Sequence, residues 1–410
     1  MKKMRKLALV VPSLHRGGGV PAVARFVWET ATRDGTWDVR PVSLCMASDD
    51  PESSSLANVA TLFRGPVVGK RTWLERDVPH VGARFGELEF QRYRPRSVLS
   101  ELLSDCDVIQ VVCGSPAWAN AVLDLGKPVS LQVATLARIE RRMRDGHGRG
   151  AVAAWRRTMT RITNRMDERA LRRVDAIQLE NPWMLHHVQE ANLGRPGVDI
   201  RYAPPGVDAT LFHPEGSRSP TSGHILCVGR LDDPRKNIGL LLEAYALLPQ
   251  EVRQRHRLVL AGAGSPPQSF WQRAAGLGLL DRVEFIHRPD QGALVVLYQQ
   301  AAAFALPSDE EGLGVVVLEA MACGVPVVST RSGGPDGILT HGTDGCLVPR
   351  DDAAAMAMAL CEVLESPRAN VDMGREARAT IERVYAREVA GRAFLNVWER
   401  LVAGDAACAD

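Results

Sequence analysis

The sequence predicts an α/β chain of two doubly wound domains, each built on a parallel sheet. Short β-branched apolar runs alternate with longer helical patterns throughout the 410 residues. Continuous apolar strands of this kind are typical of parallel sheets that helices cover on both faces. The chain also exceeds one average core and suits two domains of about 200 residues each. Pro204 and Pro205, which cannot continue a sheet ladder, separate the two series of strands.

The first series of strands begins directly after a basic N-terminus. Its first apolar run is short, lacks a small-residue cleavage site and leads into a glycine loop, so it indicates a buried strand rather than a signal peptide. Residues 50–97 mix Arg, Pro and Gly with aromatic residues and predict an irregular insertion. The strands expected in this half are residues 7–12, 39–45, 108–113, 128–134, 175–180 and 200–203.

The second series follows a polar, glycine-containing surface loop at residues 215–223. After its last strand the chain ends in a helical pattern, Glu382 to Val402. The expected strands are residues 224–230, 257–262, 282–286, 302–306, 326–330 and 345–348.

Composition predicts a soluble protein of a reducing compartment, and hence a cytoplasmic one. Apolar residues make up 45% of the chain and charged residues 24%, which is ordinary for a globular protein. No apolar run approaches the ~20 residues that a membrane span needs. The eight cysteines are scattered, without a CxxC pair or metal-ligand spacing, and so resemble small buried hydrophobic residues.

The net charge of +2 is unevenly distributed. Between Arg138 and Arg173 the chain has twelve arginines against four acidic residues. Such a block can face anionic lipid, a phosphorylated acceptor or nucleic acid. Its aromatic content is a single Trp155, which disfavours a stacking platform for nucleic acid. Membrane-surface contact and a solvated pair of amphipathic helices both remain open.

Two glutamates, Glu311 and Glu319, lie in a stretch that reads as strand, loop, helix and strand. Glycines 312 and 314 let the backbone approach a ligand closely, and a helix N-terminus offers N–H groups to an anion. Glu311 is expected at the carboxyl end of a strand, where open α/β sheets bind ligands. Glu319 is expected about two helical turns further along on roughly the same face. An ordinary βαβ unit with two solvated glutamates is the alternative.

Two cations follow the first strand of the second series. That strand ends at Gly229, Arg230 leaves it, and Lys236 lies near the start of the next helix. Because a cation is unfavourable at a helix N-terminus, Lys236 indicates an anionic partner. Together the two side chains can clamp a diphosphate and stabilise its charge as a bond to it breaks. The alternative is a pair of surface cations.

A first glycine loop, Gly17-Gly18-Gly19, lies between the first strand and a helical pattern. It is not a dinucleotide fingerprint, because no third glycine opens the helix. It can still receive a phosphate at a helix N-terminus, or serve as a plain turn. The strict Asp-x-Asp pair, Asp105 and Asp107, precedes its strand and so lies at the amino end, away from the ligand edge. We therefore predict no metal site.

The order of these motifs resembles that of the retaining glycosyltransferases of family 4. The resemblance covers essentially the whole second domain; in the first it is limited to the early glycine loop and the run from Asp167 to Asp175. It implies the GT-B fold, two Rossmann-like domains that face each other across an active-site cleft. The motifs that carry it are Ala203-Pro-Pro-Gly-Val-Asp, Phe212-x-Pro, Gly229-Arg-Leu, Arg235-Lys-Asn, the Glu311/Glu319 block and Ser332-Gly-Gly-Pro with Gly342-x-x-Gly-Cys-Leu-Val.

The resemblance also implies how the chain is divided. Residues 1–204 would form the acceptor-binding domain and residues 205–381 the donor-binding domain. Residues 382–410 would form a C-terminal helix that crosses back to the first domain.

Site residues follow from the same resemblance. Arg230 and Lys236 would hold the donor diphosphate, Glu311 would contact sugar hydroxyls, and Glu319 would contact the ribose. The family often has a histidine after its fourth strand, but the matching stretch, Leu131 to Leu136, has none. Candidates to replace it are Gln132, Thr135 and His147. Further donor contacts are expected at Gly18, Gly19, Gly229, Arg288, Gly312, Leu313, Gly314, Val315 and Val316.

The function implied is transfer of a hexose, or a derivative of one, from a UDP- or GDP-sugar to an acceptor hydroxyl with retention of configuration. No metal and no other cofactor is expected. The acceptor remains open among small molecules, glycans and lipid-linked sugars. A nucleotide-sugar epimerase or hydrolase of the same fold is the alternative. The protein is expected in the cytoplasm, peripheral at the inner membrane face if the basic segment binds lipid, and without a nucleic-acid partner.

Overall fold

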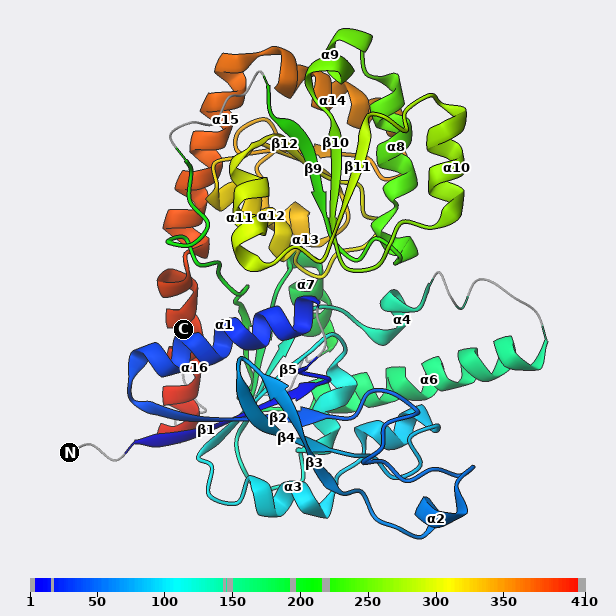
Figure 1. Ribbon diagram of the computed structural model, residues 1–410. Helices are drawn as coiled ribbons and strands as arrows, with labels where there is room; N and C mark the ends of the chain where they lie inside the picture. Colours follow the sequence, from blue (N-terminus) through cyan, green and yellow to red (C-terminus); the bar gives the residue numbers. More distant parts are fainter. Residues whose placement is uncertain are drawn as a thin grey trace. The chain divides into compact units, whose positions relative to one another are not determined.

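The chain divides into two compact units, each with its own sheet (Figure 1). The structure is a computed structural model, which describes residues 4–15, 18–142, 145, 150–191, 197–215 and 222–404. Unit 1 consists of Met1–Pro205 together with Gly391–Asp410. Unit 2 consists of Gly206–Ala390.

Unit 1 is built on an eight-stranded sheet with the order β3-β4-β2-β1-β5-β6-β7-β8. All neighbours pair in parallel except β3, which runs antiparallel to β4 at the edge. The order reverses at β1, which lies between β2 and β5. The strands are β1 (Arg5–Pro12), β2 (Trp37–Leu44), β3 (Val68–Trp73), β4 (Arg76–Val81), β5 (Val108–Cys113), β6 (Val129–Val133), β7 (Ala176–Leu179) and β8 (Asp199–Tyr202).

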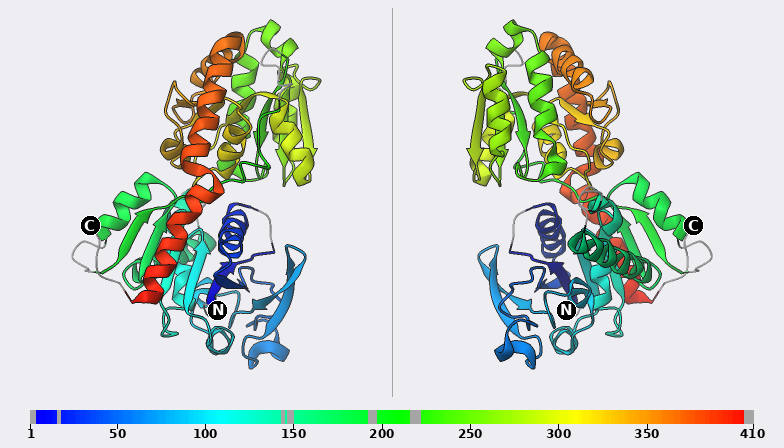
Figure 2. Two further views of the ribbon diagram at one scale, coloured as in Figure 1. Left: turned by 90° about the vertical axis from the view of Figure 1, so that its left-hand side faces the viewer. Right: turned by 90° about the vertical axis from the view of Figure 1, so that its right-hand side faces the viewer.

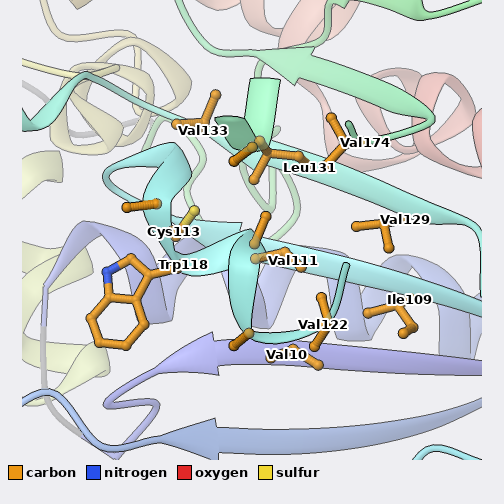
Figure 3. Close-up of a cluster of buried hydrophobic side chains, with 14 of the residues drawn as sticks. Val10, Ile109, Val111, Cys113, Trp118, Val122, Val129, Leu131, Val133 and Val174 are labelled. Atoms are coloured by element: carbon orange, nitrogen blue, oxygen red, sulfur yellow. The ribbon is translucent and has the colours of Figure 1, made fainter. Parts of the chain in front are cut away.

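One face of this sheet carries the main apolar core of unit 1, to which Ile109, Val111 and Leu131 contribute from β5 and β6 (Figure 3). The opposite face of β5 meets α16 (Arg387–Ala403), where Trp398 Nε1 donates to Gln110 Oε1 at 2.7 Å. The helices of unit 1 are α1 (Gly19–Asp34), α2 (Val59–Leu62), α3 (Ser97–Leu102), α4 (Ala137–Glu140), α6 (Ala151–Leu171) and α7 (Pro182–Ala191), with 3-10 turns η1 (Glu89–Tyr93) and η2 (Pro116–Ala121).

Unit 2 is built on a six-stranded, fully parallel sheet with the order β11-β10-β9-β12-β13-β14. Alternate residues enter two separate cores, as Cys227 and Val228 do, because helices cover both faces (Figure 2). The strand order reverses between β9 and β12. The strands are β9 (His224–Val228), β10 (Leu258–Gly262), β11 (Val283–His287), β12 (Ala301–Leu306), β13 (Val327–Thr330) and β14 (Cys346–Val348).

The last helical stretch of the chain is interrupted at Ala386. A single π-helical turn, η4 (Ile381–Tyr385), ends there, and α16 (Arg387–Ala403) begins one residue later. The other helices of unit 2 are η3 (Pro234–Lys236), α8 (Ile238–Leu247), α9 (Gln250–Arg255), α10 (Gln268–Gly276), α11 (Gln291–Gln299), α12 (Val315–Ala322), α13 (Gly334–Ile338), α14 (Ala353–Glu365) and α15 (Pro367–Thr380). Among the described residues, no helix combines the length and the hydropathy that a membrane span requires.

The expected fold class, two doubly wound α/β domains, is confirmed. All the expected strands are present, and their bounds agree within two residues. The expectation of an irregular insertion at residues 50–97 is wrong in part, because this segment contains the β3-β4 hairpin. The first sheet is consequently not fully parallel.

Candidate functional site

A lysine and a glutamate meet at the carboxyl edge of the unit 2 sheet. Lys236 Nζ lies 2.6 Å from Glu311 Oε1, and both side chains are largely buried, with 18% and 9% of their surfaces exposed. Lys236 follows β9 and Glu311 follows β12, the adjacent strands between which the order reverses. Open α/β sheets bind their ligands at such a switch point. The structure thus joins these two predicted site residues directly.

The Lys236 loop is held by polar side chains around it. The Asp233 carboxylate accepts from Arg235 N at 3.1 Å, and Asn237 Oδ1 accepts from Leu240 N at 3.3 Å to cap α8. Asn237 itself has a left-handed backbone, with φ of 42°, which asparagine tolerates better than most residues. Its Nδ2 donates to Asp309 Oδ1 at 2.8 Å and so ties this loop to the one after β12.

The Glu311 loop is fixed from both sides by the segment after β13. Glu311 N donates to Ser332 O at 2.8 Å, and Gly334 N donates to Glu311 O at 3.0 Å. A Cβ at Gly334 would lie 2.2 Å from the Leu313 carbonyl oxygen, so only glycine permits this approach. Gly314 then takes the left-handed conformation that starts α12, with φ of 86°. Gly312, Leu313, Val315 and Val316 thus form the loop and first helical turn beside Glu311.

Glu319 lies in a different environment from Glu311. α12 begins only at Val315, so Glu319 is in its second turn and Glu311 is outside the helix. Glu311 thus lies in the loop after β12, as expected, and Glu319 lies within the helix that follows. Tyr298, from α11, donates its hydroxyl to Glu319 Oε2 at 2.8 Å. Burial raises the pKa of Glu319 to about 7, although the hydrogen bond from Tyr298 opposes that rise.

The remaining candidates of unit 2 lie at the same sheet edge. Arg230 leaves β9, is about half exposed and pairs with Asp233 at 2.9 Å rather than with Glu311. Gly229 is approached by β10, because a Cβ at Gly262 would lie 2.2 Å from Gly229 O. Arg288 follows β11, is exposed and has a left-handed backbone with φ of 49°.

The acceptor-side candidates lie in unit 1. Gln132 is fully buried on β6, and its Nε2 donates to Glu180 Oε1 at 3.2 Å and to Ala203 O at 3.4 Å. Thr135 is buried just beyond β6, and its N–H donates to Gly114 O at 2.9 Å. His147 lies outside the described residues. Gln132 and Thr135 therefore both make hydrogen bonds that hold this edge of the unit 1 sheet together.

Gly18 and Gly19 stand at the start of α1, the first helix after β1. Gly18 is the N-cap, with φ of 128°, and the order of the unit 1 sheet reverses at β1. This is the position expected of a loop that receives a phosphate. Gly17, the first glycine of the loop, lies outside the described residues.

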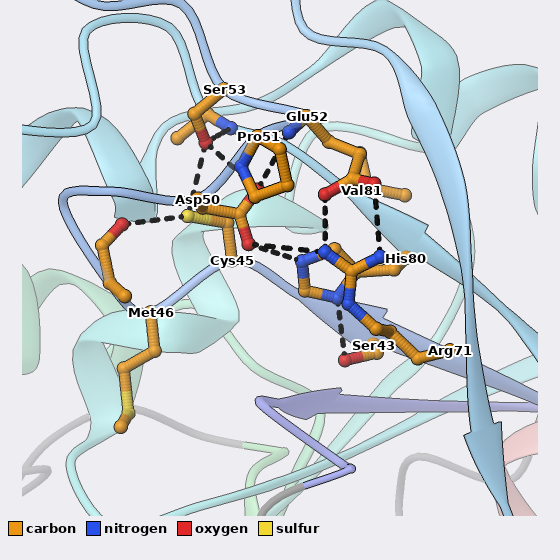
Figure 4. A network of polar contacts seen from close by, with 12 residues as sticks. Ser43, Cys45, Met46, Asp50, Pro51, Glu52, Ser53, Arg71, His80 and Val81 are labelled. Carbon is orange, nitrogen blue, oxygen red and sulfur yellow. Dashed lines mark hydrogen bonds and ion pairs between the residues drawn. The ribbon is translucent and has the colours of Figure 1, made fainter.

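A separate polar cluster in unit 1 has the geometry of metal ligands (Figure 4). His80 Nε2 lies 2.7 Å from Asp50 Oδ2, and Glu52 is near both. The Arg71 guanidinium, however, donates to Glu52 at 2.9 Å and so already supplies a positive charge. We assign no metal to this cluster.

The acidic Asp-x-Asp pair is occupied by contacts within the protein. Asp105 pairs with Lys6 at 2.5 Å and with Arg40 at 2.6 Å. Asp107 accepts from the Lys6 backbone N–H at 2.7 Å. The two residues precede β5 and tie its amino end to β1 and β2.

Three residues that contact the predicted site residues were not themselves predicted from the sequence. Ser308 donates to Glu311 Oε1 at 2.6 Å, Tyr298 bonds to Glu319, and Glu180 bonds to Gln132. Glu180 directly follows β7, and Ser308 lies two residues after the end of β12, so position at a carboxyl end was a signal that could have found them. Tyr298 comes from another helix, and spacing alone gives no signal for it.

The family match found among known proteins lies within unit 2. Residues 210–380 match the family described as glycosyl transferases group 1. A D-inositol 3-phosphate glycosyltransferase of Catenulispora acidiphila is 35% identical over 189 residues, 42% of this chain and 44% of that protein. A GDP-mannose-dependent alpha-(1-6)-phosphatidylinositol monomannoside mannosyltransferase of Mycolicibacterium smegmatis is 32% identical over 195 residues, 44% and 50% of the two chains. The aligned parts thus span about half the length of these relatives.

Solved structures match over nearly the whole chain, though at low identity. Sucrose-phosphate synthase from Thermosynechococcus elongatus has a TM-score of 0.71 at 20% identity and covers 98% of this chain and 100% of its own. Anabaena HepE in complex with UDP-glucose has a TM-score of 0.68 at 17% identity, with 96% and 99% covered. These likenesses show the fold alone. Residues 210–380 thus match the glycosyl transferases group 1 family, and the chain has the GT-B fold of these solved structures.

Proposed function

We propose that the protein is a retaining glycosyltransferase that moves a hexose, or a derivative of one, from a UDP- or GDP-sugar to an acceptor hydroxyl. The observation that carries the proposal is the Lys236–Glu311 pair at the switch point of the unit 2 sheet. A buried cation beside a buried carboxylate suits a ligand that combines a diphosphate with sugar hydroxyls. The family matched by unit 2 and the names of its relatives support the same reaction class.

In this proposal each donor group has its own partner. Lys236 has three N–H donors, of which Glu311 takes one, so the others can meet the diphosphate together with Arg230. Glu311 accepts from sugar hydroxyls, and Glu319 accepts from the ribose. Backbone N–H groups from Gly312 to Val316 surround the sugar and phosphate at the start of α12. The segment of His287 and Arg288 borders the base.

The reaction breaks the bond between the anomeric carbon and the diphosphate oxygen, and the electron pair leaves with the diphosphate. The acceptor oxygen forms the new bond on the same face of the sugar, and its proton passes to the departing diphosphate. Lys236 and Arg230 stabilise the charge that develops there. Glu311 positions the sugar and acts as an electrostatic group rather than as a covalent nucleophile, because its carboxylate already accepts from Lys236 and Ser308.

We propose that this reaction needs no metal. The two cations supply the positive charge that a divalent ion provides to a departing diphosphate elsewhere. Turnover should therefore be unchanged by EDTA. A loss that Mg²⁺ or Mn²⁺ restores would contradict this part of the proposal.

The acceptor hydroxyl is assigned to unit 1. The two relatives are named for inositol phosphate and phosphatidylinositol monomannoside acceptors, so polyol and lipid-linked acceptors come first among those to be tried. We further propose that the protein is cytoplasmic and that its basic segment, Arg138 to Arg173, contacts the membrane surface.

The donor is tested with a thermal-shift panel of UDP-, GDP-, ADP- and TDP-sugars on the full chain. One base should raise the melting temperature, and Lys236→Ala should remove that rise. If no nucleotide sugar stabilises the wild-type protein, the donor assignment is overturned.

Donor consumption then separates transfer from the alternative reactions. A transferase should leave the donor intact until an acceptor is added, whereas an epimerase or a hydrolase converts it alone. Mass spectrometry with candidate polyols and lipid-linked sugars identifies the product. Rapid formation of free sugar or of an epimer from donor alone would contradict the transfer reaction.

A further inference from the structure

The short helix α2 carries an exposed apolar tip, which we name the α2 tip and define as Leu56, Val59 and Phe63. Their side chains are 48%, 79% and 91% exposed. Val59 and Phe63 are four residues apart and therefore share one face of the turn. A nearly fully exposed phenylalanine beside two exposed aliphatic residues is an apolar patch of the kind that marks an interaction site.

The base of the α2 tip is fixed by polar contacts. Leu56 N donates to Glu87 Oε1 at 3.1 Å, and Asn58 Oδ1 caps the helix by accepting from Ala60 N at 3.0 Å. Arg64 Nη2 donates to Pro51 O at 3.0 Å on the other side. The apolar side chains are thus presented outward on a preorganised turn, and none of them belongs to the core clusters.

A second exposed apolar pair lies at the beginning of α6, which we name the α6 start and define as Val152 and Trp155. These side chains are 64% and 51% exposed. The helix itself is well anchored, because Met159 and Thr163 are buried along its other face. Asp167 accepts from Ala117 N at 2.8 Å and Ala137 N at 2.9 Å, which fixes α6 to its neighbours.

The exposed side of α6 is strongly basic. It carries one exposed acid, Glu168, against five exposed arginines: Arg156, Arg157, Arg161, Arg165 and Arg169. Helix α2 and the N-terminal end of α6 lie on the same side of unit 1, the right-hand side in Figure 1, and both are turned toward the viewer in the right-hand panel of Figure 2. Apolar and aromatic side chains next to arginines are the composition of elements that bind the interface of an anionic bilayer.

We propose that unit 1 docks on an anionic membrane through these two elements. The α2 tip and the α6 start insert into the boundary between headgroups and acyl chains, and the α6 arginines bind acidic headgroups. Charge complementarity favours this occupant over a second copy of the chain, because the arginine face of one copy would repel that of another. The inference deepens the membrane contact of the proposed function but does not rest on the transfer reaction.

Vesicle binding by the full chain tests the proposal. The protein should co-sediment with vesicles of phosphatidylcholine containing phosphatidylglycerol, and much less with phosphatidylcholine alone. Raising NaCl from about 0.05 to about 0.5 M should weaken binding, because it screens the arginines. Trp155 fluorescence, isolated by subtraction of W155F, should shift to the blue on binding. Equal binding to both vesicle types, or none, would overturn the proposal.

Variants separate the apolar contribution from the charged one. V59S/F63S should lower the partition onto anionic vesicles at least about tenfold while the dependence on salt remains. R156Q/R157Q/R161Q should lower it and flatten the dependence on salt. The matched control is M358S, which removes a similarly exposed apolar side chain from α14 of unit 2, and it should bind as wild type.

All these positions are exposed, so each variant should keep the wild-type melting temperature. Donor binding by unit 2 should also be unchanged, which distinguishes loss of docking from loss of the proposed function. If V59S/F63S binds vesicles normally but dissociates a dimer in sedimentation velocity, the patch is an interface between copies and the membrane proposal fails.

Discussion

At the scale of single residues, Lys236 and Glu311 are each other's counter-charge in a largely buried position. Removing either one leaves an uncompensated charge, which costs stability of about 3 to 5 kcal/mol. We expect Lys236→Ala and Glu311→Ala each to cut turnover at least about a hundredfold. We also expect each to lower the melting temperature, so activity alone cannot separate the two effects.

The double variant Lys236→Met/Glu311→Gln separates them. It removes both charges together, so much of the stability should return, whereas turnover should stay low. Melting temperature and kcat measured on all variants give the answer. Turnover that recovers along with stability would mean that the pair is structural.

Glu180 gives a prediction about pH. Burial raises its pKa from 4.5 to about 7, although the hydrogen bond from Gln132 opposes that rise. Because the folded protein holds this proton more tightly than the unfolded chain, the resulting stability is complete below pH 4.5 and is lost as pH rises through 7. The loss is on the order of 3 kcal/mol. Glu180→Gln should flatten the free energy of unfolding across this window, as measured by urea denaturation.

The control for that experiment is Glu101→Gln, which changes an exposed carboxyl group of α3. It should leave the pH profile of unfolding unchanged. If Glu180→Gln also leaves the profile unchanged, Glu180 is already ionised in the folded protein and its proton has no part in stability.

Residue type and position in the sequence were enough to predict Lys236 and Glu311 as members of the candidate site. Lys236 and Glu311 stood out because a charge beside a strand end and a glycine has few structural uses. Their joint contact was not predictable, since it depends on β9 and β12 being neighbours in the sheet. The partner Tyr298 was not predictable from spacing either, because it comes from another helix, whereas Ser308 lies only three residues before Glu311 and could have been found from its position.

At the scale of elements, the Glu311 loop depends on Gly334 at the start of α13. A Cβ there would meet backbone atoms of Leu313, with the nearest at 2.2 Å, and backbone cannot move aside cheaply. Gly334→Ala should therefore cost about 1 to 3 kcal/mol of stability and reduce turnover by displacing Glu311. The control Gly276→Ala, in α10, has open space around its Cβ and should be neutral. Wild-type kinetics in Gly334→Ala would contradict this account of the loop.

The strands were predictable where both faces are buried, because a continuous β-branched run has no other common explanation. The β3-β4 hairpin broke that pattern. β3 largely alternates exposed and partly buried residues, and β4 begins with the exposed residues Arg76 and Asp77 and contains Pro79. The apolar pattern of such a half-exposed hairpin is too weak to predict strands from the sequence. The hairpin becomes evident only in the structure, where β4 pairs with β2.

At the scale of the whole molecule, the chain passes from one unit to the other at Pro205 and again within α16, which belongs to unit 1 from Gly391 onward. Trp398 is fully buried there, in edge contact with Trp37 at 5.6 Å between ring centroids and bonded to Gln110. Trp398→Ala should destabilise unit 1 by about 3 to 5 kcal/mol. Differential scanning calorimetry should show that the temperature of one unfolding transition falls by on the order of 10 °C, while that of the other is unchanged.

The donor nucleotide then identifies which transition belongs to unit 2. A ligand that binds only the folded form raises the transition of the unit that holds it. The nucleotide that the wild-type protein binds, UDP or GDP, should raise the temperature of the transition that Trp398→Ala leaves unchanged. The reason is that the Lys236–Glu311 site lies wholly in unit 2. The Trp398→Phe variant, which keeps an aromatic ring but loses the bond to Gln110, should fall between wild type and Trp398→Ala. If the nucleotide instead raises the transition that Trp398→Ala lowers, the donor is held by unit 1 and the site assignment is wrong.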